Sequence, residues 1–74
     1  MEELLKGLNT MYPHSNFQIV EDDNDENSYI IYTDNYELVE DDAETLSVID
    51  YGMSLIDCDN LTLVYELEEN MYLD

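Results

Sequence analysis

The sequence predicts one small α+β domain over residues 1–74, with an antiparallel sheet of three to four strands and one or two helices. Short segments of β-branched and aromatic residues alternate with turn residues in the middle of the chain. A helical spacing of apolar residues opens the chain. A length of 74 residues with 45% hydrophobic residues leaves room for one thin core.

Residues 2–11 (EELLKGLNTM) are predicted to form a helix that covers one face of the sheet. Its apolar residues recur at helical spacing and make one face: Leu4, Leu5, Leu8 and Met11. The two glutamates at its start suit the positive end of the helix dipole. Pro13 then ends the helix, because proline lacks the N–H that the next helical turn needs.

Residues 16–33 are predicted to form a β-hairpin. Residues 16–21 (NFQIVE) and 29–33 (YIIYT) carry the apolar and aromatic residues typical of strands, and a turn rich in Asp and Asn separates them. Residues 36–39 (YELV) are expected to add a third strand after a turn at residues 34–35.

Residues 42–56 fit two interpretations. A helix is indicated by the cap-like pair Asp41 and Glu44 and by an apolar stripe made of Leu46, Ile49, Met53 and Ile56. A strand is indicated by the alternation of apolar with small or polar residues over 49–55, and Gly52 is unfavourable inside a helix. The cap signal and the length favour the helix.

Residues 61–67 (LTLVYEL) are predicted to form the closing strand of the sheet. Alternate residues place one apolar face on this strand: Leu61, Leu63, Tyr65 and Leu67. The acidic segment 68–74 then ends the sequence.

The balance of charge is the strongest functional signal in the sequence. The sequence contains twenty Asp and Glu residues and a single Lys or Arg residue, Lys6, which gives a formal net charge of -19. Such a chain repels nucleic acid and anionic membranes, whose phosphates are neutralised by Lys and Arg. We therefore expect no direct nucleic acid and no membrane as partners, and we expect a basic nucleic-acid-binding protein or complex instead.

The candidate partner-binding residues are concentrated in residues 21–44, which contain no Lys or Arg. If the acids crowd onto half of the surface, each charge occupies about 125 Å², close to the roughly 110 Å² per charge of duplex DNA. Exposed tyrosines among them would contact Arg side chains well. The predicted set is Glu21, Asp22, Asp23, Asp25, Glu26, Asp34, Glu37, Glu40, Asp41, Asp42 and Glu44, with Tyr32 and Tyr36.

Catalytic and cofactor motifs are scarce, and we expect neither an enzyme nor a bound cofactor. His14 follows Pro13 in a loop, far in sequence from the single cysteine, Cys58. Two glycines are too few for a phosphate-binding loop, and one Cys with one His makes no zinc site.

The acidic loop DDNDEN resembles a calcium-binding loop only superficially. An EF-hand starting at Asp23 would have Ser28 at the position of the turn glycine and Asp34 at that of the bidentate Glu. We therefore expect no specific metal site. One cysteine fits a reducing compartment, and no signal peptide or membrane span is recognised, so a cytoplasmic location is expected.

The segments EDDNDE, VEDDAE, DCDN and ELEEN, in a chain of 74 residues with one lysine, resemble in composition the small acidic DNA-mimic inhibitors of phages and mobile elements. That class includes anti-CRISPR proteins, anti-restriction proteins and uracil-DNA glycosylase inhibitors. We expect a monomer or small homo-oligomer, located in the host cytoplasm if the protein is encoded by a phage. The resemblance implies that it occupies a nucleic-acid groove of its target. It would fill the DNA- or RNA-binding groove of a nuclease or defence complex, first of all as an anti-CRISPR.

Two other functions remain open at the level of the sequence. One is an immunity protein or antitoxin that neutralises a basic nuclease toxin. The other is an acidic interaction module that binds basic proteins loosely. Both would use a similar acidic surface.

Overall fold

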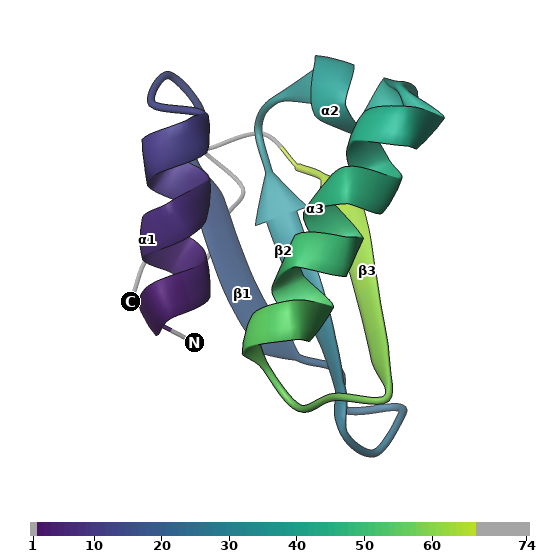
Figure 1. The fold of residues 1–74 in the computed structure, drawn as a ribbon. Coiled ribbons are helices and arrows are strands. Elements are labelled where there is room, and N and C mark those ends of the chain that lie inside the picture. The colour runs from purple at the N-terminus through teal and green to yellow at the C-terminus, as the bar shows by residue number, and fades with distance from the viewer. Residues whose placement is uncertain (1, 67–74) are drawn as a thin grey trace.

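The computed structural model describes residues 2–66, in which helices pack on one face of a three-stranded sheet (Figure 1). In chain order the elements are α1 (Glu2–Met11), β1 (Phe17–Glu21), β2 (Ser28–Thr33), α2 (Tyr36–Glu40), α3 (Asp42–Leu55) and β3 (Asn60–Tyr65). The predicted α+β class is confirmed. The described residues hold three helices, one more than the upper expectation.

Several elements agree closely with the prediction from sequence. The first helix covers the predicted residues 2–11, and the predicted hairpin is present as β1 and β2. The helical interpretation of residues 42–56 is confirmed by α3. The closing strand is confirmed as β3, which ends at Tyr65, while Leu67 and the acidic segment 68–74 lie outside the described residues.

The sheet is mixed, which corrects the expectation of a wholly antiparallel one. Its strand order is β1-β2-β3, and β1 pairs with β2 antiparallel, from Phe17 opposite Thr33. The pairing of β2 with β3 is parallel, from Ser28 opposite Asn60. The reason is the connection: α2 and α3 carry the chain back along the sheet, so β3 starts at the same end as β2.

The segment 36–39, predicted as a strand, is instead part of the short helix α2, so that prediction was wrong. The Asn35 side chain caps this helix by accepting a hydrogen bond from the Leu38 N–H at 3.4 Å. Leu38 is 4% exposed and packs into the core. A segment of only four residues, three of them apolar or aromatic, fits a strand and a single helical turn equally well, and the cap decides between them.

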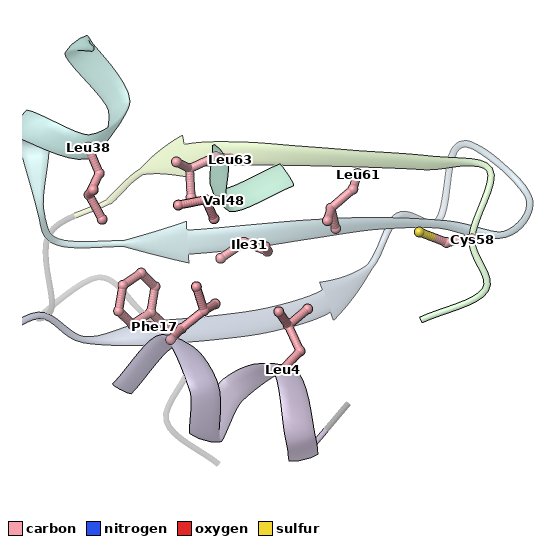
Figure 2. Packing of buried hydrophobic residues seen from close by; sticks show 9 residues of the cluster. Leu4, Phe17, Ile31, Leu38, Val48, Cys58, Leu61 and Leu63 are labelled. Carbon is pink, nitrogen blue, oxygen red and sulfur yellow. The ribbon is translucent and has the colours of Figure 1, made fainter. Parts of the chain in front are cut away.

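The core lies between the sheet and the helices and is centred on the middle strand. Figure 2 shows Ile31 of β2 with Leu4 and Phe17 on one side and Leu61 and Leu63 on the other. Ile31 and Leu4 are fully buried. The cluster thus joins all three strands to α1, and Leu38 and Val48 extend it to α2 and α3.

The buried side of α3 differs from the apolar stripe predicted for it. Val48 and Gly52 are the buried residues of this helix, while Leu46 is 61% and Met53 is 41% exposed. At Gly52, α3 lies in close contact with the rest of the core. A Cβ placed there would collide with Leu61 and would lie 3.3 Å from Leu4. A glycine therefore allows the close contact, although it is a poor helix former.

Candidate functional site

The first acidic group surrounds the turn between β1 and β2 and is called the hairpin cluster. The loop after α3 lies beside this turn, because the Asp59 N–H donates to the Asn27 carbonyl at 2.8 Å. All members are exposed except Asp22, which is half-buried. The hairpin cluster consists of Glu21, Asp22, Asp23, Asp25, Glu26, Asp57 and Asp59.

The hairpin turn itself is held by local hydrogen bonds. The Asp22 N–H donates to the Ser28 carbonyl at 2.9 Å, and the Asp22 carboxylate accepts from the Asn24 N–H at 3.0 Å. Asn27 has a φ of 53°, a left-handed conformation that asparagine tolerates better than most residues. The turn encloses a shallow hollow of about 380 Å³ lined by the first five acids of the cluster. Such a hollow can receive a Lys or Arg side chain.

The second acidic group lies around α2 and the start of α3 and is called the helix cluster. Asp34 is half-buried and the other members are exposed. The Asp34 carboxylate accepts from the Asn16 N–H at 2.9 Å and from its side-chain amide at 2.8 Å. The helix cluster consists of Asp34, Glu37, Glu40, Asp41, Asp42 and Glu44.

Asp41 has a structural role as well as a charge. Its N–H ends α2 by donating to the Glu37 carbonyl, and its carboxylate caps α3 by accepting from the Ala43 N–H at 3.0 Å and the Glu44 N–H at 3.3 Å. Loss of such a cap costs roughly 0.5–2 kcal/mol. Charge reversal at Asp41 therefore weakens the fold, whereas like-charge repulsion alone would suggest that reversal is neutral or stabilising.

The two clusters lie at opposite ends of the sheet and do not form one patch (Figure 1). The hairpin turn precedes β2 and α2 follows it, so the clusters are separated by the length of this strand, about 17 Å at about 3.3 Å per residue. The acids predicted within residues 21–44 are therefore divided between the two ends. The acids of the hairpin turn lie instead beside Asp57 and Asp59, through the parallel pairing of Ser28 with Asn60.

The two tyrosines of the predicted set differ in position. Tyr36 is 56% exposed at the start of α2, beside the helix cluster, and its ring meets that of Tyr65 edge-on at 5.2 Å. Tyr32 is half-buried, and its neighbours Ile31 and Thr33 are fully buried. Because side chains alternate along a strand, Tyr32 points to the sheet face opposite the core. Of these two tyrosines, only Tyr36 adjoins an acidic cluster.

Within residues 2–66, the carboxylates of both clusters have no cationic partner. Every hydrogen-bond donor described for them is an amide or a hydroxyl, including the Tyr12 hydroxyl, which donates to Glu44 at 3.2 Å. Burial raises the pKa of Tyr12 above its usual value, and the Glu44 carboxylate raises it further. Lys6 is exposed on α1. The two ends of the molecule are thus strongly negative.

This charge is expected to make stability depend on salt. Like charges repel in the compact state, and raising NaCl from 10 to 150 mM shortens the Debye length from about 30 to about 8 Å. We expect the Tm to rise by several degrees over this range, measured by circular dichroism at fixed pH. A Tm that is flat or falls with salt would contradict the repulsion between exposed carboxylates.

The structure separates the two residues considered for nucleophilic chemistry. Cys58 is buried beside the hairpin turn, while His14 is exposed in the loop after α1, at the other end of the molecule. Burial raises the pKa of the Cys58 thiol, and the carboxylates of Asp59 and Asp57 add to the rise. A neutral thiol is a weak nucleophile, so Cys58 serves here as a small core residue.

Two further findings concern ligands and membranes. Among residues 2–66, no group of three or more His, Cys, Asp or Glu side chains is arranged to hold a metal ion. No helix within this part of the chain has the length and apolar character needed to cross a bilayer.

Comparison with protein-family models, curated proteins and solved structures finds no match to this chain.

Proposed function

We propose that this protein inhibits a nucleic-acid-binding enzyme or defence complex by filling its basic groove, with carboxylates in place of phosphates. The observation that carries the proposal is the hairpin cluster: seven carboxylates on one turn and the adjoining loop, with neutral hydrogen-bond donors only. A surface of this kind has no compensating cation of its own. It attracts a partner that supplies Lys and Arg.

The spacing of the charges supports a phosphate-like role. The whole surface of 5137 Å², divided by 19 net charges, gives about 270 Å² per charge, which is dilute compared with the roughly 110 Å² of duplex DNA. The charges are instead concentrated at the two ends, in the turn and loop of the hairpin cluster and around the helices of the helix cluster, so the charge density there is higher than this average. Two dense ends separated by the length of β2 can each contact a different basic rim of one groove.

The target class follows from this chemistry. A nuclease or defence complex such as a CRISPR effector, with a long groove rich in Lys and Arg, offers the largest complementary surface. The protein itself is proposed to act in the cytoplasm, where such complexes work and where a single free thiol like Cys58 stays reduced.

Competition for the groove is the decisive test. A Cas9–guide complex, a restriction endonuclease and a uracil-DNA glycosylase would each be mixed with a fluorescent 20-base-pair duplex and titrated with the full chain at 150 mM salt. For the true target we expect the anisotropy of the duplex to fall to that of free DNA. The midpoint should rise in proportion to the duplex concentration, as for two ligands of one site.

The outcome that would overturn the proposal is simultaneous binding. If the protein and the duplex co-elute on one target in size-exclusion chromatography, the groove is not the binding site. The protein alone, titrated into the duplex, serves as the control and should leave the anisotropy unchanged. Weak binding to every member of the panel, without displacement, would instead fit an acidic interaction module.

A further inference from the structure

The outer side of α3 carries an apolar stripe whose two end residues, Leu46 and Met53, lie outside the core, while Ile49 between them packs in part against it. Leu46 is 61% exposed and Met53 is 41% exposed, and Ile49 is half-buried between them. Successive members are three and four residues apart, so their side chains are neighbours on the helix surface. Single exposed apolar residues are common. Three on consecutive turns of one helix make a continuous contact strip.

The stripe is not a poorly packed part of the core. The side of α3 that faces the sheet is formed by Val48 and Gly52, and Gly52 is in close contact with Leu61. At about 100° per residue, Leu46 and Met53 point well away from that direction. The helix therefore has two apolar sides, one of which is buried and one of which is open.

The border of the stripe is acidic. Asp42 lies four residues before Leu46, and Asp50 lies four residues after it, and both are exposed. No Lys or Arg occurs in α3. A partner that fits this surface has apolar side chains in the middle and cations at the sides. A second copy of the chain would bring the same acids together, and its net charge of -19 opposes that contact.

We propose that the stripe formed by Leu46, Ile49 and Met53 binds a basic amphipathic helix of a partner protein. The apolar face of that helix packs on the stripe, and its flanking Lys or Arg side chains reach Asp42 and Asp50. Recognition of this kind places apolar anchors at helical spacing in contact with a complementary surface. This surface shares only Asp42 with the helix cluster and otherwise differs from the groove-filling surface, since its central contacts are apolar and phosphate groups have no counterpart to them.

The test compares the affinities of the full chain for two fluorescent peptides. One is an 18-residue peptide of Leu and Lys with Leu at helical spacing, and the other contains the same number of Lys residues with Ser in place of Leu. Anisotropy titrations at 150 mM salt should give tighter binding of the amphipathic peptide. Leu46→Ser together with Met53→Ser should weaken it about tenfold and leave the Ser-containing peptide within twofold, because only the apolar contact is lost.

Matched variants keep the test sharp. Met11→Ser removes an apolar side chain of similar exposure on α1 and should leave both peptides unaffected. Asp42→Asn with Asp50→Asn should weaken both peptides, more than Asp23→Asn with Asp25→Asn does. Thermal melts identify any variant that has lost its fold, and Leu46→Gln alone then replaces the double variant.

Two results would overturn the inference. One is an affinity for the amphipathic peptide that does not change when Leu46 and Met53 are replaced by Ser. The other is a stable dimer of the wild-type chain in sedimentation at 150 mM salt that the same replacement dissociates, because the stripe would then be covered by a second copy.

Discussion

Removing three charges from the hairpin cluster, by Asp23→Asn, Asp25→Asn and Glu26→Gln, is expected to weaken binding to the target at least about 100-fold. Each amide has nearly the shape of the carboxylate that it replaces but cannot pair with a Lys or Arg. Removing one partner of a partly desolvated charge pair weakens the binding free energy by about 2–5 kcal/mol. None of the three side chains makes a hydrogen bond that holds the turn together, so the fold should be unaffected.

The choice of these three residues depends on the structure. Asp22 and Asp41 belong to the densest acidic runs of the sequence, but both side chains cap backbone N–H groups. Replacing either residue would remove a charge and a capping hydrogen bond together, so the two effects on binding could not be separated. Glu37→Gln with Glu40→Gln tests the helix cluster without touching its cap at Asp41.

The matched control changes the net charge by the same amount elsewhere. Asn9→Lys, Met11→Lys and His14→Lys add three charges at exposed positions around the end of α1, far from the hairpin cluster and on the side of the helix cluster, where Tyr12 donates to Glu44. We expect this variant to slow association and to stay within about fivefold of the wild-type affinity, because distant charges act mainly through long-range attraction. Equal losses in the two variants would mean that net charge alone governs binding and that the hairpin cluster is not a specific site.

Local patterns in the sequence were sufficient for most of the fold. The helical spacing of Leu4 and Leu8, the β-branched residues of the hairpin and the Asp41 cap are signals within a few residues of each other, and each predicted the correct element. The short helix α2 was missed because its signal is a single hydrogen bond from Leu38 to the Asn35 side chain. The parallel direction of β3 was missed because it depends on how the connecting helices pack.

The candidate site was predictable in composition but not in arrangement. Every acid of the hairpin turn was identified from its density in the sequence. Asp57 and Asp59 were not in the predicted set, because the strand register that places Asp59 beside Asn27 is a long-range feature.

Gly52→Val is expected to destabilise the fold strongly. A Cβ at this position meets Leu61 and lies 3.3 Å from Leu4, and both leucines are buried. Forcing extra atoms into a packed core typically costs 1–3 kcal/mol. A domain of this size has a total stability of about 4–11 kcal/mol, and each kcal/mol shifts the Tm by roughly 4–8 °C. We expect the Tm to fall by about 4–24 °C.

Two companion variants separate packing from helix propensity. Ser47→Val places the same β-branched residue at an exposed position of α3 and should cost only a few tenths of a kcal/mol. Leu61→Ala destabilises by leaving a cavity, roughly 2–5 kcal/mol, but it also creates room for the new valine. The double variant Gly52→Val with Leu61→Ala should therefore be more stable than the sum of the two single losses predicts, by about 1 kcal/mol or more. Strict additivity in urea unfolding would show that α3 and β3 do not meet at Gly52, and the close contact that explains a glycine in the middle of this helix would have to be abandoned.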